Sequence, residues 1–231
     1  SYSKNVCELK YEFVNAYKGN SHTTEILPNV PAESFLINEK QLSLLHEFLN
    51  VNPIYSNHIV EKISGVDYTI FEGDLNNYWI DSIKHDASYA PFYPTWVLSA
   101  WGLALAAKNL GFEQIIDIGS GDGRIAYCGK TLGLESISIE IDENLVNLQE
   151  DISKKTGVEF NPKCADATIF NFEDILPKKS IFVIGGVPEI GEVLAESVIK
   201  NVLEVLEMSD VSFVLTGSHS HREFSRDRTD S

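Results

Sequence analysis

Short apolar runs alternate with helix-compatible segments through the second half of the chain. Runs of this length, bounded by glycines or polar turns, are typical of buried strands, and the segments between them carry apolar residues at helical spacing. Strands and helices that alternate roughly every 20 to 30 residues predict parallel βαβ units with right-handed crossovers. The fold class is therefore predicted to be α/β, with a doubly wound, mostly parallel sheet. The predicted strands are 114–118, 136–141, 158–160, 180–184 and 211–216, and the predicted helices between them are 122–132, 142–156 and 192–207.

The first 87 residues show a less regular pattern. Apolar residues in 38–50 fall on one helical face, and Asn38 is placed to cap that helix together with Gln41. Segments 59–68 and 75–85 predict further short helices or turns, punctuated by glycines. We therefore expect a mainly helical N-terminal accessory region over 1–87, packed against the rest of the chain.

A proline-rich segment, SYAPFYPT, opens the second part of the chain at residue 88. Its prolines exclude a helix, and Thr95 is placed to cap the helix that follows. That helix is apolar nearly all round and should be well buried before it ends at Gly111. We predict a core over 88–216 and, in 217–231, a polar tail that forms a loop or is disordered.

The charge of the chain is strongly acidic, with 34 Asp and Glu against 18 Lys and Arg and a net charge of −16. Nucleic acids are bound largely through Lys and Arg, so a nucleic-acid partner is disfavoured and a basic protein partner is favoured. Solubility alone would explain the same charge. No apolar run has the length of a membrane span, the N-terminus lacks a signal-peptide layout, and the three cysteines suggest no disulfide framework, so we expect a cytoplasmic protein.

The glycine-rich stretch that follows the first core strand carries the strongest chemical signal. Glycines allow a tight turn and a close approach of a ligand to the backbone. The spacing is G-x-G-x-G, not the G-x-G-x-x-G of dinucleotide sites, and Asp117 and Asp122 would repel a diphosphate. A cationic ligand without phosphate fits better, and S-adenosylmethionine (SAM) is such a ligand. The loop residues expected to cradle its methionine part are Gly119, Ser120 and Gly121.

Three carboxylates follow successive strands at positions that suit the rest of this cofactor. Asp117 is expected to hold its ammonium group, and Glu140, which ends the second strand beside Ile141, its ribose hydroxyls. Asp166, flanked by Ala165 and Ala167, is expected to accept from the adenine amino group. Simpler interpretations remain open. Asp117 could cap the loop amides, Asp166 could form an Asx-turn, and Arg124 could pair with Asp122 or Asp117 or be exposed.

The segments D-I-G-S-G-D-G-R, I-E-I-D and A-D-A-T resemble the successive SAM-binding motifs of class I, seven-strand methyltransferases over 88–216. The resemblance implies a Rossmann-like methyltransferase sheet. With Y-A-P-F-Y-P-T upstream, the chain is also similar to archaeal broad-specificity protein-lysine methyltransferases. In that group the aromatic-Pro-Thr segment, here Tyr93, Pro94 and Thr95, lines the cofactor pocket and the mouth of the substrate channel. The family's closing hairpin is not evident after residue 216.

The acceptor is less well indicated than the cofactor. The turn after the fourth strand, Gly-Gly-Val-Pro-Glu189, lacks the Asn/Asp-Pro-Pro-aromatic pattern of base and glutamine methyltransferases. Tyr93 and Glu189 are candidates for the methyl-transfer channel, although Glu189 could be a solvated loop carboxylate. No metal site is predicted. We expect a SAM-dependent methyltransferase acting on protein lysine. The alternatives are an RNA or small-molecule methyltransferase, an inactive SAM-binding or partner-binding subunit, and, more distantly, an NAD-dependent oxidoreductase.

Overall fold

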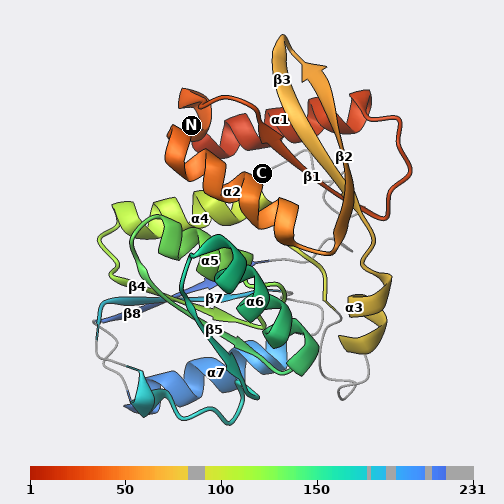
Figure 1. The fold of residues 1–231 in the computed structure, drawn as a ribbon. Coiled ribbons are helices and arrows are strands. Elements are labelled where there is room, and N and C mark those ends of the chain that lie inside the picture. The colour runs from red at the N-terminus through yellow and green to blue at the C-terminus, as the bar shows by residue number, and fades with distance from the viewer. Residues whose placement is uncertain (83–91, 176–177, 186–190, 206–209, 217–231) are drawn as a thin grey trace.

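The computed structural model describes residues 1–82, 92–175, 178–185, 191–205 and 210–216 (Figure 1). A parallel sheet with helices on both faces forms the lower part of the molecule in this view, and an N-terminal layer of helices and a small sheet lies above it. The glycine-rich loop therefore belongs to the lower part, and the N-terminal layer covers the helices that pack on this sheet.

The central sheet has five parallel strands in the order β6-β5-β4-β7-β8. Chain order makes this a 3-2-1-4-5 arrangement, which is that of the doubly wound Rossmann-like fold. The predicted fold class is confirmed. The strands are β4 (Gln114–Ile118), β5 (Glu135–Glu140), β6 (Asn161–Cys164), β7 (Ser180–Ile184) and β8 (Val211–Leu215).

Each face of the sheet packs on its own set of helices. On β4, Ile115 belongs to the apolar cluster shared with the N-terminal layer, while Ile116 and Ile118 pack with Ala195 and Val198 of the helix on the opposite face. This alternation follows from the two-residue period of a strand. The helices are α4 (Val97–Asn109), α5 (Arg124–Thr131) and α6 (Glu143–Thr156) on one face and α7 (Gly191–Val205) on the other, with a short 3-10 turn η2 (Phe172–Asp174) (Figure 1).

The third core strand lies later in the sequence than predicted. The apolar pattern predicted 158–160, but β6 is Asn161–Cys164. Val158 and Phe160 are buried in the connection from α6, whereas most of β6 is exposed at the edge of the sheet. A polar edge strand gives no apolar run, so the pattern identified the buried connection instead.

The N-terminal layer contains a sheet that the sequence did not predict. Segment 59–68, expected as a short helix or turn, spans the end of β2, the turn at Ser64 and Gly65, and the start of β3. Most of β2 is exposed, so it lacks the alternation by which a strand is recognised. The antiparallel sheet has the order β1-β3-β2. The elements of this layer are α1 (Tyr2–Ala16), β1 (Thr23–Pro28), η1 (Glu33–Phe35), α2 (Glu39–Val51), β2 (Tyr55–Ile63), β3 (Val66–Gly73) and α3 (Asn76–Ser82).

The cap predicted from the sequence is present in α2 but not in α4. The capping box of α2 is confirmed, because the Asn38 side chain accepts from the Gln41 N–H and the Gln41 side chain accepts from the Asn38 N–H, each at 3.0 Å. Thr95 does not cap α4. The Val97 N–H donates instead to the carboxylate of Glu25 at 2.8 Å, so a residue of β1 satisfies the start of this helix.

The two layers share one continuous apolar cluster. Phe48 of α2 packs on Tyr127 of α5 with ring centroids 4.8 Å apart, and the Tyr127 hydroxyl donates to the Leu44 carbonyl at 2.8 Å. The N-terminal layer therefore stabilises the sheet from the side of α4, α5 and α6. None of the helices in the described part of the chain is long and apolar enough to cross a membrane.

Gly129 provides a test of the close packing between α5 and the sheet. A Cβ at this position would lie 2.5 Å from Cγ2 of Ile115 and 2.8 Å from Oγ of Ser136. The overlap should cost about 1–3 kcal/mol, more than the roughly 1 kcal/mol that alanine gains over glycine in a helix. Gly129→Ala should therefore lower the free energy of unfolding measured with urea. Lys130→Ala, at the neighbouring half-exposed position, is the control and should change it little; a stabilised Gly129→Ala variant would contradict this packing.

Candidate functional site

The glycine-rich loop leaves β4 in a left-handed backbone conformation that favours glycine. Gly119, Gly121 and Gly123 have φ of 64°, 57° and 76°. A Cβ at Gly119 would meet no atom of the described residues within 4 Å, so they leave the loop open on that side, whereas a Cβ at Gly121 would lie 2.3 Å from the ring of Phe92. The loop thus presents one open backbone position and one covered by an aromatic ring.

The carboxylate of Glu140 ties the loop to the end of β5. Its Oε2 accepts from the Gly121 N–H at 2.8 Å, and its Oε1 accepts from the N–H groups of Ile141 at 2.9 Å and Asp142 at 3.1 Å. A carboxylate has about four acceptor positions, so the described residues leave one position for another donor. Burial raises the pKa of Glu140 despite these three bonds.

Gln149 of α6 is a further residue of this site that the sequence did not indicate. Its amide donates to the Ser120 hydroxyl at 2.9 Å and the Gly121 carbonyl at 2.7 Å, and it accepts from the Ser138 hydroxyl at 2.6 Å. A Cβ at Gly123 would lie 2.9 Å from its side chain. The sequence indicates Gln149 only by its position, since it has the helical spacing of the leucines on the apolar face of α6.

Asp117 lies near the carboxyl end of β4 and is only 2% exposed. Its Oδ2 is buried and has no hydrogen-bond partner in the described part of the chain. Burial raises its pKa to about 8, and the negative charges of Glu140 and Asp122 add to the effect. A buried carboxylate oxygen without a partner is rare in folded proteins, and this one lies where a doubly wound sheet binds its ligand.

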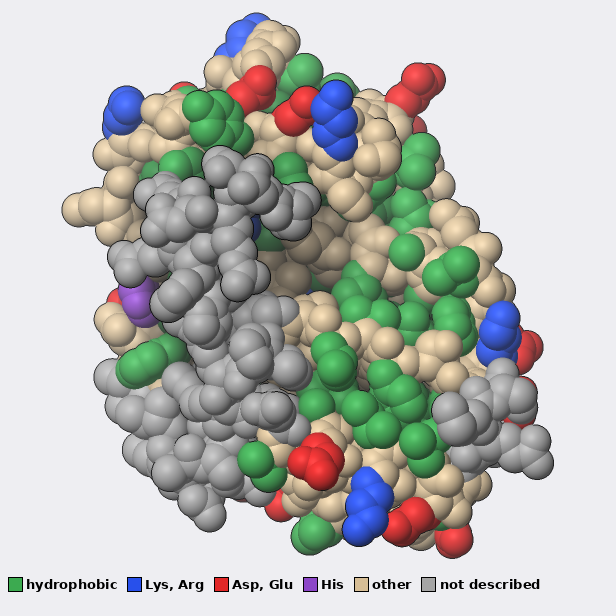
Figure 2. Space-filling view, turned by 180° about the vertical axis from the view of Figure 1, so that it is seen from behind, with side chains coloured by type: hydrophobic (Ala, Val, Ile, Leu, Met, Phe, Trp, Pro, Cys, Tyr) green, Lys and Arg blue, Asp and Glu red, His purple; other side chains and the backbone are tan. Residues whose placement is uncertain are grey.

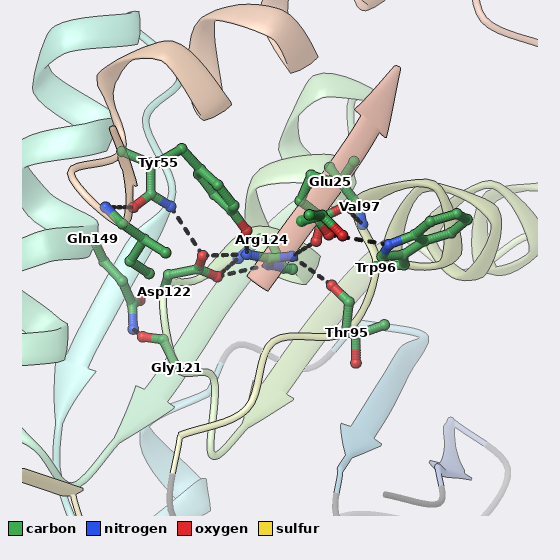
Figure 3. Close-up of polar contacts among 12 residues, drawn as sticks. Glu25, Tyr55, Thr95, Trp96, Val97, Gly121, Asp122, Arg124 and Gln149 are labelled. Atoms are coloured by element: carbon green, nitrogen blue, oxygen red, sulfur yellow. Dashed lines mark hydrogen bonds and ion pairs between the residues drawn. The ribbon is translucent and has the colours of Figure 1, made fainter. Parts of the chain in front are cut away.

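Arg124 is buried, not exposed, and pairs with two carboxylates (Figure 3). Its Nη2 lies 2.6 Å from Oδ2 of Asp122, and its Nη1 donates to Glu25 of β1. Nη2 also donates to the Tyr55 hydroxyl at 2.9 Å and Nη1 to the Thr95 carbonyl. The charge of Asp122 is thus compensated by Arg124, so the expectation that Asp122 would repel a diphosphate at the loop is not supported.

The other residues predicted for the site range from buried to half-exposed, and one lies outside the described residues. Asp166 follows β6, and its Oδ1 accepts from both the N–H and the hydroxyl of Thr168, at 2.9 and 2.7 Å, as in an Asx-turn. Ala167 is buried, and Tyr93 is 53% exposed next to the buried Phe92. Glu189 and the tail 217–231 lie outside the described residues.

A polar pocket of about 440 Å³ lies away from this loop. It opens at one end of the N-terminal sheet and contains none of the predicted site residues; it is lined by Asn20, Ser21, His22, Ser56, Asn57, Glu72, Gly73 and Asp74. Within the described ranges, no group of three or more His, Cys, Asp or Glu side chains is placed to hold a metal ion. Figure 2 shows a hollow near the centre of the face opposite to Figure 1, with mostly uncharged side chains around it.

Comparison with known proteins finds distant similarity to methyltransferases. No protein-family model matches the chain. Protein-L-isoaspartate O-methyltransferase 2 of Marinobacter nauticus is 32% identical over 98 residues, which are 41% of this chain and 44% of that protein. The match thus spans less than half of that relative.

Solved structures overlap with about half of the chain. The PH0226 protein of Pyrococcus horikoshii OT3 is 18% identical, with a TM-score of 0.47 over 56% of each chain. An RNA methyltransferase of Salinibacter ruber in complex with S-adenosyl-L-homocysteine is 23% identical, with a TM-score of 0.40 over 53% of this chain and 79% of that one. The fold assignment rests on the strand order above and not on these overlaps.

The raised pKa of Asp117 predicts a pH-dependent effect of Asp117→Asn on stability. The carboxyl titrates near pH 8 in the folded protein and near pH 4 when unfolded, so the folded state binds the extra proton between these values. The free energy of unfolding of the wild type should therefore fall as pH rises from 5 to 8. Asn cannot ionise, so the variant should have the higher Tm at pH 8, with the difference shrinking toward pH 5. A difference that is constant over this range, measured by thermal unfolding, would contradict the assignment.

Proposed function

We propose that this chain is a SAM-dependent methyltransferase that N-methylates lysine side chains of basic proteins. The observation that carries the proposal is the buried Oδ2 of Asp117, which has no hydrogen-bond partner among the described residues and lies beside the open backbone of Gly119. This position is next to the point where the strand order of the sheet reverses, between β4 and β7. Ligands of doubly wound sheets bind at such a point.

The charges around the loop favour a cationic ligand over a diphosphate. Asp117 and Glu140 are both buried, and burial raises the pKa of each. Arg124, which directly follows the loop at the start of α5, is already bonded to Asp122 and Glu25. A diphosphate would therefore be repelled by Asp117 and Glu140 when they are ionised. An ammonium group would instead stabilise their ionised forms.

The residues present fit S-adenosylmethionine. Asp117 would hold its ammonium group, the open backbone at Gly119 its methionine part, and the free acceptor position of Glu140 one ribose hydroxyl. Asp166 follows β6, at the position proposed for the adenine. Its Oδ1 already accepts from the Thr168 N–H. When bound, the cofactor supplies an activated methyl group on a sulfonium.

The acceptor side of the site has an aromatic border. Phe92 covers Gly121, and Tyr93 next to it is exposed enough to meet an incoming side chain. A lysine must lose a proton before it can act as a nucleophile, and removal from water next to aromatic rings lowers its pKa. No dedicated base is then required, and these residues would mainly align the amine and exclude water.

The net charge of −16 supports a basic protein as the acceptor, because opposite charge steers association. The printed name of the M. nauticus relative describes O-methylation of a protein isoaspartate. A carboxylate acceptor or an RNA is itself negatively charged, so the negative charge of this protein would repel it. Lysine-rich segments are positively charged and would be attracted.

Transfer of a labelled methyl group tests this proposal. The protein is incubated with methyl-labelled SAM and, separately, with histones, bulk RNA and an acidic protein. We expect base-stable label in histones that is recovered as methyl-lysine, with at least a hundredfold loss in Asp117→Asn. Base-labile label would indicate a methyl ester, and label in RNA an RNA acceptor; either would overturn the lysine assignment. Failure of the wild type to bind SAM would overturn the cofactor.

The pKa of Asp117 also predicts how cofactor binding depends on pH. An ammonium ligand requires the ionised carboxylate, which forms near pH 8 in the free protein. Affinity for SAM should therefore rise about tenfold from pH 6 to 7 and about fivefold from pH 7 to 8, where half of the carboxyl is already ionised. Calorimetry should show protons released on binding. Asp117→Asn should bind weakly with no such dependence, and equal wild-type affinities at pH 6 and 8 would contradict the role of Asp117.

A further inference from the structure

The turn between α2 and β2 reaches the glycine-rich loop through one buried side chain. Asn52 is 1% exposed, and its amide donates to Oδ2 of Asp122 at 3.0 Å. Its own oxygen accepts from the Ile54 N–H at 3.1 Å, which fixes the side chain in the turn. A residue of the N-terminal layer thus contacts a loop 70 positions later in the sequence.

The contact with Asn52 completes the hydrogen bonding of Asp122. Oδ1 of Asp122 accepts from the N–H and Nε of Arg124 at 3.3 and 2.9 Å, and Oδ2 accepts from Nη2 of Arg124 and from Asn52. Four bonds use the acceptor capacity of a carboxylate. Asp122 is therefore held by Arg124 of α5 and by Asn52 of the N-terminal layer, and has no position left for a ligand.

Asp122 lies between Gly121 and Gly123, two glycines with positive φ. Glycines leave a loop with many accessible conformations, so the loop needs side-chain contacts to hold the one shown. Gln149 holds it from the side of α6, through Ser120 and Gly121. Asn52 and Arg124 hold it at Asp122, and Figure 3 shows Asp122 directed toward Arg124.

From these contacts we infer that Asn52 is a positioning residue of the cofactor site, which holds the loop at Asp122 in the conformation that binds SAM. The N-terminal layer thereby completes the cofactor site. This inference rests on the proposed function for its ligand. A loop that is already ordered binds more tightly, because less conformational freedom is lost on binding.

Asn52 is better suited to a test than its neighbours. Glu25 and Tyr55 act on the loop only through Arg124, and loss of that cation would leave buried carboxylates unpaired. Asn52 makes one neutral donor contact to the loop, so its removal leaves the ion pair of Arg124 and Asp122 in place.

The test uses the full chain with Asn52→Ala, Asn52→Asp and, as the matched control, Tyr127→Phe. The control also removes one hydrogen bond between the two layers, from the Tyr127 hydroxyl to Leu44, without touching the loop. Hydrogen exchange of the peptide covering 117–124 is measured without ligand, and the Kd for SAM by calorimetry. We expect Asn52→Ala to speed exchange in this peptide and to raise the Kd, each about tenfold. Tyr127→Phe should leave both within about twofold, whatever its Tm.

Asn52→Asp separates the loop contact from the turn. Asp still accepts from the Ile54 N–H but presents a negative charge to Asp122, so it should raise the Kd at least as much as Ala. Wild-type behaviour of Asn52→Asp, or equal effects of Asn52→Ala and Tyr127→Phe, would overturn the positioning role. A wild type that does not bind SAM would overturn the proposed function, while the exchange measurement still decides whether Asn52 orders the loop.

Discussion

One buried cation connects the parts of this molecule. Arg124 has five N–H donors in its guanidinium group, and all five have partners: Glu25, Tyr55, the Thr95 carbonyl and Asp122 twice. These partners come from β1, β2, the segment before α4 and the glycine-rich loop. Burying a charge is costly unless it is paired and hydrogen-bonded. The loop, the start of α4 and the small sheet must therefore assemble together around this residue.

With Arg124 bonded to Asp122 and Glu25, the two carboxyl groups on the ligand side of the loop have no bonded cation in the described part of the chain. Asp117 and Glu140 are buried, and burial is the main cause of their raised pKa values. Such an arrangement is unfavourable for folding, since each carboxylate must be ionised in a poorly solvated position or remain protonated. The same arrangement favours the binding of a positively charged ligand. Asp117 therefore lowers the stability of the fold and at the same time promotes ligand binding.

The sequence predicts the core well because the strands of a parallel sheet are buried on both faces and appear as apolar runs. The same reasoning fails for β6 at the edge and for β2, which are mostly exposed and carry no such run. Asp117 could be identified because it follows a strand directly. The pairing of Arg124 with Glu25 joins residues 99 positions apart, so no local pattern indicates it. Thr95 was favoured as the cap of α4 for the same reason, since only tertiary structure brings Glu25 to that helix.

The segment before α4 links the two sides of the proposed site. The ring of Phe92 lies on Gly121, and three residues later the Thr95 carbonyl accepts from Arg124. Glu25 then holds both Arg124 and the Val97 N–H at the start of the helix. A displacement of the aromatic border would therefore move the loop, both through the contact of Phe92 with Gly121 and through the bonds of Arg124. Because the border proposed to face an acceptor and the loop proposed to hold the cofactor have common anchors, a displacement next to Tyr93 and order in the loop are physically coupled.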